Sequence, residues 1–168
     1  MRNRCVDFMF LAVLITGGSL YAYAESYHRD AFIHWSDVDH DGYDARQQAL
    51  KMQSVGPVKC VKTSHGFVVV SGKWICPYTG KIFTNPHDVD LDHVVSLSWA
   101  WKHGADSWKP SIRTEFANDQ ENLLVVDATE NRRKGDKGPD EWLPSRKGYR
   151  TEYHEKWTRI IKKYELEE

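Results

Sequence analysis

Three carboxylates and a histidine are concentrated in one short segment, residues 88–93, which reads Asp-Val-Asp-Leu-Asp-His. In an extended strand, carboxylates at alternate positions lie on one face. They repel one another unless a cation lies among them, and hard divalent cations are bound by carboxylate oxygens. The imidazole beside the last carboxylate can accept a proton from water at neutral pH. These residue types predict a metal-assisted hydrolytic site, with a polar strand edge that faces solvent as the alternative interpretation.

Two asparagines further along the chain fit the same kind of site. Asn122 opens the apolar run Leu-Leu-Val-Val at residues 123–126, which predicts a strand, and Asn131 follows nine residues after it. Between them, Asp127 and Glu130 have the spacing of a capping box, which predicts the start of a helix. The predicted order is a strand that ends in Asp-His, a strand opened by Asn, and a helix that carries Asn.

This order resembles the HNH, or ββα-metal, nuclease motif. Similar segments extend the match: residues 72–74, 77–80, 90–95, 99–101, 103–105, 108, 116–119, 122–124 and 131–144. Together they resemble a branch of small, often secreted HNH endonucleases, which is related to the C-terminal nuclease domain of modification-dependent restriction enzymes. The resemblance extends over residues 35–165. One departure is Ser96, where relatives commonly have proline.

The resemblance implies a role for each matching residue. His93 corresponds to the general base that activates water, and Asp92 and Asn131 correspond to the metal ligands. Asn122 corresponds to the asparagine that holds the loop carrying the base. Asp90 is expected either to contact the metal ligands without binding the metal itself, or to lie near the bound phosphate.

The chemistry of phosphodiester hydrolysis agrees with these roles. A cation is needed on the phosphate oxygens, and two protein ligands leave most of a Mg²⁺ shell for water and phosphate. The expected cofactor is therefore a divalent metal, Mg²⁺ first, with Mn²⁺ or another ion left open. Basic residues that follow Asn131 are candidates for phosphate binding, with a solvated helix end as the alternative: Arg132, Lys134 and Lys137.

The N-terminal residues 1–24 have the features of a signal peptide. Arg2 and Arg4 are basic, residues 8–15 form an apolar run, and residues 22–24 read Ala-Tyr-Ala. Cleavage after Ala24 would leave residues 25–168 as a single secreted or periplasmic HNH domain with no membrane partner. An uncleaved N-terminal anchor is the alternative.

Two cysteines remain after this cleavage, Cys60 and Cys76. In an exported chain an even number of cysteines predicts a disulfide. The expected bridge closes a β-hairpin over residues 60–76 and stabilises the fold by about 3 kcal/mol. Two buried free thiols are the alternative.

The composition fits a folded domain of the α+β class. The chain has 168 residues, 40% of them hydrophobic, and a formal net charge of −1. This charge excludes a protein that coats nucleic acid, although residues 131–163 have a clear excess of Lys and Arg. Helices are expected at 44–53, at 97–103, from 127 to about 135, and in a final segment with an apolar stripe from Tyr149 to Tyr164.

A third acidic motif, Asp37 to Gly42, has the opening pattern of an EF-hand loop. Its twelfth position is Gln48, so the bidentate glutamate of a calcium loop is missing. We interpret the motif as a turn or cap before the first helix, with a Ca²⁺ site as the alternative.

These patterns favour an exported, divalent-metal-dependent HNH endonuclease. No helix-turn-helix or zinc finger pattern is visible, which predicts low sequence specificity, with DNA as the favoured substrate and RNA left open. The alternative is a non-catalytic extracellular module that binds nucleic acid or metal on an HNH scaffold. A weaker third reading is a Ca²⁺-binding adhesion fragment, which rests on Asp37 to Gly42 alone.

Overall fold

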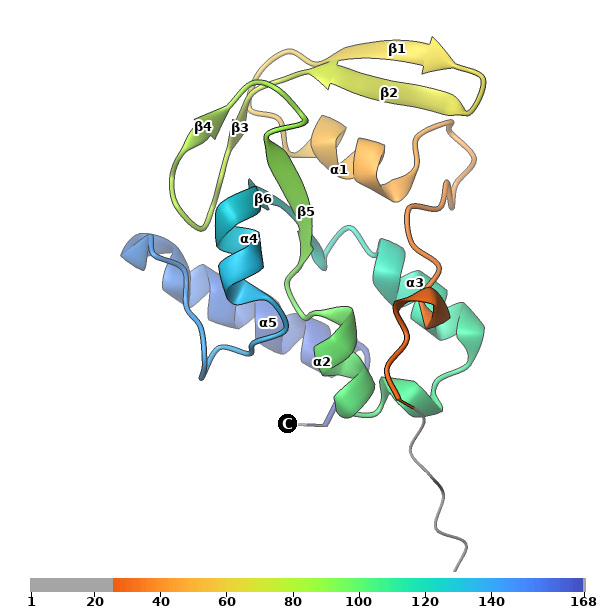
Figure 1. Cartoon of the computed structure of the whole chain (residues 1–168), viewed down its shortest axis with the longest axis vertical. Coiled ribbons are helices and arrows are strands. Elements are labelled where there is room, and N and C mark those ends of the chain that lie inside the picture. Colours follow the sequence, from red (N-terminus) through yellow and green to blue (C-terminus); the bar gives the residue numbers. More distant parts are fainter. Residues whose placement is uncertain (1–25, 168) are drawn as a thin grey trace, which may run out of the picture.

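The computed structural model describes residues 26–167, so the predicted signal peptide lies outside the described residues. The chain is a mixed α+β protein, as the sequence predicts (Figure 1). Its α-helices are Ala45–Met52 (α1), Leu97–Lys102 (α2), Pro110–Asn118 (α3), Ala128–Lys134 (α4) and Arg150–Lys163 (α5). Short 3₁₀ turns lie at Arg29–Ala31 (η1), Ala105–Ser107 (η2) and Lys147–Tyr149 (η3).

Within residues 26–167 the strands form three small antiparallel sheets of two strands each. They are Lys59–Thr63 (β1) with Gly66–Ser71 (β2), Trp74–Ile75 (β3) with Ile82–Phe83 (β4), and Val89–His93 (β5) with Leu123–Asp127 (β6). Figure 1 shows the β1–β2 hairpin at one end of the molecule, with α1 beneath it, and α5 and α2 in the opposite half. No helix within residues 26–167 is long and apolar enough to cross a membrane.

The third sheet and the helix after it form a ββα unit in the predicted order. Val89 of β5 pairs with Asp127 of β6, and His93 pairs with Leu123. The Asp127 side chain then accepts hydrogen bonds from the backbone N–H groups of Thr129 and Glu130, which caps α4 at the predicted start. The box is only half formed, because the Asp127 N–H donates to the Cys76 Sγ and not to Glu130. Because α4 begins where β6 ends, its inward face is directed at β5.

The predicted disulfide is wrong. Residues 60–76 form not one hairpin but the β1–β2 hairpin and the start of a second one, β3–β4. Cys60 is exposed on β1, whereas Cys76 is buried in the core, where its Sγ accepts a hydrogen bond from the Asp127 N–H. Both thiols are free, so backbone pairing and not a bridge closes the hairpin.

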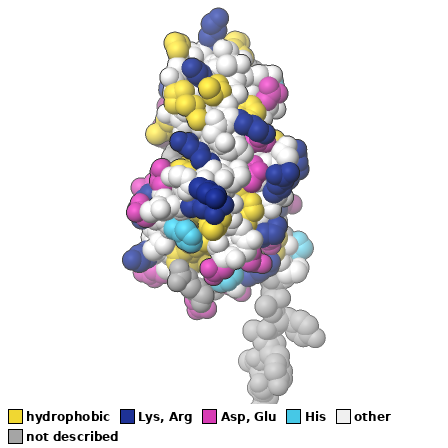
Figure 2. Space-filling model, turned by 90° about the vertical axis from the view of Figure 1, so that its left-hand side faces the viewer, with side chains coloured by type: hydrophobic (Ala, Val, Ile, Leu, Met, Phe, Trp, Pro, Cys, Tyr) yellow, Lys and Arg dark blue, Asp and Glu magenta, His cyan; other side chains and the backbone are white. Residues whose placement is uncertain are grey.

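The β1–β2 hairpin also has an apolar outer surface. Val61, Val68 and Val70 are each between 38% and 51% exposed. Hydrophobic side chains gather at the corresponding end of the molecule in Figure 2.

The core is built on α5 and on the sheet of the ββα unit. The residues of the predicted apolar stripe on the last helical segment are all buried: Tyr149, Tyr153, Trp157, Ile160, Ile161 and Tyr164. All five residues of β6 are buried as well, so both of its faces are covered. A second cluster joins α1 to β2, β5 and β6. The two clusters pack on either side of the ββα unit and fix its position.

The remaining helices agree with the sequence in part. α1 begins after Asp44, whose side chain accepts from the Gln47 N–H, and α2 begins after Ser96, which caps it through the Trp99 N–H. Ser96 therefore supports the helix by capping its first turn. Helix α3 was not predicted, although Pro110 at its first turn is a common helix start.

Candidate active site

A cavity of about 300 Å³ lies where β5 ends, between α2, α4 and the N-terminal segment. Several residues that the sequence analysis selected line this one space. The charged and polar groups on its walls include Arg29, Asp92, His93, Asn131, Arg132 and Asp136. The structure thus brings Asp92, His93 and Asn131 together, although Asn131 follows His93 by 38 positions.

His93 is buried and its ring is held in one orientation. Its Nε2 lies 2.8 Å from the carbonyl oxygen of Ala117. A carbonyl can only accept, so Nε2 carries the hydrogen and Nδ1 keeps its lone pair. Burial lowers the pKa of His93 to about 3, so the imidazole is neutral at pH 7. Trp35 stacks on the ring, with ring centroids 5.8 Å apart and an angle of 16° between the planes.

Asn122 fixes the loop that follows His93. It is fully buried at the start of β6. Its Oδ1 accepts from the Val95 N–H at 2.9 Å, and its Nδ2 donates to the Val95 carbonyl at 3.1 Å. Its own backbone carbonyl accepts from the Val94 N–H. Three hydrogen bonds to two consecutive residues hold this loop, which is the placement that the resemblance implies for the middle asparagine.

Asp92 takes part in a buried network that the sequence analysis did not foresee. Its Oδ1 lies 2.9 Å from the Lys134 Nζ, and its Oδ2 accepts from the Tyr78 hydroxyl at 2.6 Å. Burial raises the pKa of the Asp92 carboxyl, and the Lys134 ammonium and the Tyr78 hydroxyl oppose that rise. The carboxylate is therefore held in place from two sides while it still lines the cavity.

The phosphate-binding role predicted for Lys134 is wrong. The Lys134 side chain is 0% exposed, and its ammonium also donates to the His93 carbonyl at 2.8 Å. The physical reason is helical phase, because residues three apart lie on one face of a helix. Asn131 and Lys134 both face β5. The Lys134 ammonium therefore points inward to Asp92 and not outward to solvent.

Asn131 also contacts β5, at Asp90, two residues before Asp92. Its Nδ2 donates to Asp90 Oδ2 at 3.2 Å. Since a carboxylate only accepts, this contact turns the amide so that Asn131 Oδ1 is left for another partner. Asp90 therefore orients the Asn131 amide.

The other two predicted phosphate-binding residues lie on the surface. Arg132 is exposed and lines the cavity. Lys137 is exposed but donates to the carbonyls of Arg133 and Lys134 at the end of α4. Lys and Arg side chains are spread over the middle of the face that is turned to the viewer in Figure 2. Arg132 is the better placed of the two for a substrate in the cavity.

The donor set fits a hard divalent cation. Asp92 offers a carboxylate and Asn131 an amide oxygen, and both line the cavity. Each carboxylate oxygen has two lone pairs, so the hydrogen bonds from Tyr78 and Lys134 still leave acceptor capacity on Asp92. Oxygen donors with room for water suit Mg²⁺ or Mn²⁺.

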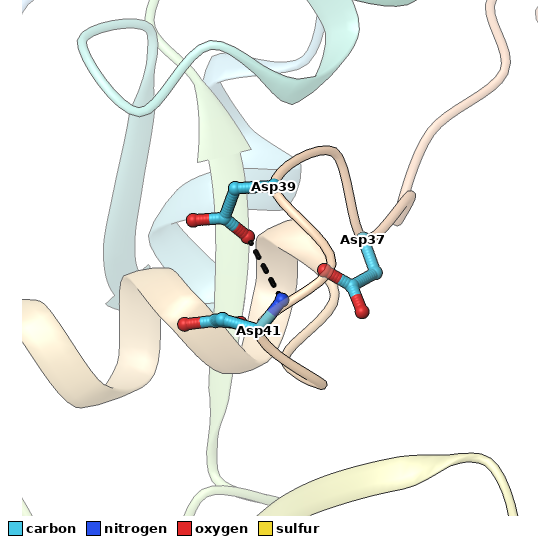
Figure 3. Close-up of side chains that lie close together, drawn as sticks. All are labelled: Asp37, Asp39 and Asp41. Atoms are coloured by element: carbon cyan, nitrogen blue, oxygen red, sulfur yellow. Dashed lines mark hydrogen bonds between the residues drawn. The ribbon is translucent and has the colours of Figure 1, made fainter.

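The acidic motif before α1 forms a separate cluster, shown in Figure 3. One carboxylate oxygen from each of Asp37, Asp39 and Asp41 lies within 4.8 Å of the others. These side chains also accept backbone hydrogen bonds within the loop, such as Asp37 from the Gly42 N–H at 3.0 Å and Asp41 from the Tyr43 N–H at 2.8 Å. Such bonds are typical of turns and favour the interpretation as a turn before α1.

Three residues of the site were missed from the sequence: Arg29, Trp35 and Tyr78. Tyr78 was included only in residues 77–80, one of the segments that carry the resemblance, and was given no role. Arg29 and Trp35 come from a segment more than 50 residues before His93 in the chain. The positive φ of Trp35, 63°, is rare for a bulky residue and marks a constrained position, but no pattern of residue types indicates it.

Comparison with known proteins gives two matches. Residues 58–168 match the family described as "GmrSD restriction endonucleases, C-terminal domain". An uncharacterized secreted protein of Arthroderma benhamiae (strain ATCC MYA-4681 / CBS 112371) is 38% identical over 144 residues, which cover 84% of this chain and 68% of that protein. No solved structure matches. The region that matches the family contains the whole ββα unit.

Proposed function

The chain belongs to the family of GmrSD restriction endonuclease C-terminal domains, and from this premise we propose that it is an exported, divalent-metal-dependent endonuclease. It hydrolyses the phosphodiester bonds of nucleic acid. One observation carries the proposal: a neutral, oriented imidazole shares a cavity with two oxygen donors, Asp92 and Asn131.

His93 acts as the general base in this proposal. Its Nδ1 accepts a proton from the attacking water, while the Ala117 carbonyl keeps the ring from turning. Burial keeps His93 unprotonated in the free protein, so the acceptor is available at neutral pH. A bound phosphate anion raises the proton affinity of the ring as the water loses its proton.

Asp92 and Asn131 hold the cation in this proposal. A divalent ion bound by these two residues would supply positive charge that offsets the negative charge of the reacting phosphate. Lys134 and Tyr78 fix the Asp92 carboxylate, and Asp90 turns the Asn131 amide. Mg²⁺ or Mn²⁺ suits this oxygen donor set.

DNA cut with little sequence preference is the proposed substrate. Within residues 26–167 most elements contribute to the two packed clusters around the ββα unit, and none of the described elements forms a separate module for reading base sequence. RNA is tested alongside DNA.

Export is the second part of the proposal. The relative at 38% identity is named as a secreted protein, and residues 1–24 have the pattern of a signal peptide. Cleavage after Ala24 spares Arg29, Phe32 and Trp35, which belong to the folded domain. N-terminal sequencing of the exported protein should therefore begin at Glu25; a sequence that begins at Met1 would indicate an uncleaved anchor.

The activity is tested with residues 25–168 and supercoiled plasmid DNA, with structured RNA in parallel. The buffers contain EDTA or one of Mg²⁺, Mn²⁺, Ca²⁺ and Zn²⁺. The expected result is cleavage with Mg²⁺ or Mn²⁺ and none with EDTA. A His93→Ala preparation is the matched control, and equal cleavage by both preparations would reveal a contaminating nuclease. Metal-dependent binding without cleavage would instead support the non-catalytic binding module.

A further inference from the structure

The segment before α1 closes one side of the cavity that contains His93. Phe32 anchors it, because its side chain is fully buried in the core. Asn118 of α3 fixes it further: Oδ1 accepts from the Ser36 N–H at 2.8 Å, and Nδ2 donates to the Ile33 carbonyl at 2.7 Å. The segment lies outside residues 58–168, the part that matches the family. Its position is nevertheless defined by the packing of Phe32 in the core and by two part-buried hydrogen bonds to Asn118.

Arg29 projects from this segment and lines the cavity. His34 holds it. The His34 Nδ1 lies 2.7 Å from the Phe32 carbonyl, which can only accept, so Nδ1 carries the hydrogen and Nε2 is an acceptor. Arg29 Nε donates to this Nε2 at 3.4 Å. The guanidinium is thus oriented through Nε, and its terminal nitrogens are not paired with any carboxylate in residues 26–167.

The charges around the cavity favour an anion. Each carboxylate on its wall already has a lysine partner at 2.9 Å: Asp92 with Lys134, and Asp136 with Lys102. Arg29 and Arg132 line the same space, and the ion pairs formed within residues 26–167 include neither of them. The uncompensated charge of the cavity is therefore positive on two sides.

We propose that Arg29 is a catalytic residue that binds the scissile phosphate, and that His34 is its positioning residue. The inference rests on the proposed function. In the reaction the water oxygen forms a bond to phosphorus and gives its proton to His93, and the bond to the leaving oxygen breaks, with solvent returning a proton to that oxygen. Negative charge grows on the phosphate oxygens, and a planar guanidinium can donate to two of them at once.

The first test compares Arg29→Ala with Arg159→Ala in the 25–168 protein. Arg159 is exposed on α5 and gives a matched loss of charge away from the cavity. We expect kcat on DNA to fall about 10²–10³-fold for Arg29→Ala, the usual effect of removing one donor to a developing charge. Arg159→Ala should cleave like the wild type. Arg29→Lys should recover only part of the rate, because lysine keeps the positive charge but lacks the planar guanidinium that donates to two phosphate oxygens at once.

The second test uses bis(p-nitrophenyl) phosphate, which contains a single phosphate. If Arg29 binds the scissile phosphate, Arg29→Ala should lose about the same factor on this substrate as on DNA. A loss on DNA alone would place Arg29 on a flanking phosphate and would overturn the proposal. Equal unfolding temperatures of wild type and variant establish that the fold is intact.

The third test separates positioning from catalysis. His34→Ala should lower kcat less than Arg29→Ala does, and the double variant should be no slower than Arg29→Ala alone, because His34 acts through Arg29. Additive losses would show that His34 acts independently. A wild type that cleaves no substrate with any metal would end the proposed function itself. An active wild type with Arg29→Ala equal to Arg159→Ala would end only this inference.

Discussion

His93 and Asp92 are neighbours in sequence, but the proposed mechanism gives them different roles. In His93→Ala the proposed cation ligands remain, so metal and DNA binding should persist while the rate falls about 10²–10⁴-fold. Raising Mg²⁺ should not restore activity, because the metal site is already filled.

Asp92→Asn is the comparison for this prediction. It weakens the only charged ligand of the proposed metal site, so added Mg²⁺ should recover part of the lost rate by mass action. Cleavage rates of both variants across a Mg²⁺ titration show which of them responds to added metal. Rescue of His93→Ala together with an unresponsive Asp92→Asn would reverse the two assignments.

The Lys134–Asp92 pair should dominate the stability of the site. Lys134→Met leaves the Asp92 carboxylate buried without its counter-charge, which should cost about 3–5 kcal/mol of unfolding free energy. Lys102→Met removes a surface pair whose side chains are 59% and 51% exposed, and it should cost less than about 1 kcal/mol. Urea denaturation of both variants measures the difference. Asp92→Asn combined with Lys134→Met should cost less than the sum of the two single changes.

Burial of His93 also predicts how stability depends on pH. Its pKa is about 3 in the folded protein and 6.5 in the unfolded chain. Between these values the unfolded chain binds the additional proton, so stability falls as the pH drops below 6.5, by up to about 1.4 kcal/mol per pH unit. Unfolding free energies with EDTA between pH 7 and pH 4 measure this slope. His93→Gln should show a shallower slope, and an unchanged slope would contradict the burial of a neutral ring.

At the scale of elements, the positions of the two cysteines predict which of them reacts with a thiol reagent. Cys60 is exposed on β1, whereas Cys76 is buried. A thiol reagent should therefore modify one cysteine in the folded protein and both after unfolding in the absence of reductant. Peptide mass spectrometry identifies the modified residue. Two unreactive cysteines that become reactive only after reduction would show that a bridge exists after all.

The elements that the sequence predicted are those determined by local patterns. The apolar run of β6, the Asp127 cap of α4 and the apolar stripe of α5 depend on neighbouring residues, and each appears as expected. Asn122 and Asn131 could be selected because strand and helix positions follow from these same patterns. Helix α3 was missed because it has little apolar periodicity beyond its starting proline.

The errors concern contacts between distant segments. Pairing of Cys60 with Cys76 was expected from their number, but it is the fold that places them in separate hairpins. The inward direction of Lys134 could have been inferred from its spacing to Asn131, since the two lie on one helical face. The approach of Arg29 to the cavity depends on the burial of Phe32, which no local pattern reveals.

At the scale of the whole molecule, the N-terminal segment should be indispensable. A chain of residues 37–168 lacks Phe32, whose loss from the core alone should cost about 3–5 kcal/mol, and it lacks Arg29. We expect a lower unfolding temperature and no cleavage of DNA, measured against residues 25–168. Full activity of the shorter chain would show that the region matching the family is sufficient by itself.

The buried Lys134–Asp92 pair has a consequence for the cell that makes this protein. Lys134 comes late in the chain, and Asp92 is also held by Tyr78, whose ring packs against Tyr153 of α5. A nascent chain, or one crossing a membrane unfolded, therefore contains every catalytic side chain but no assembled site. If the chain is the nuclease proposed above, this delay would protect the genome of the producer, because activity would begin only where the complete domain folds. Folding after export would confine that activity to nucleic acid outside the cell.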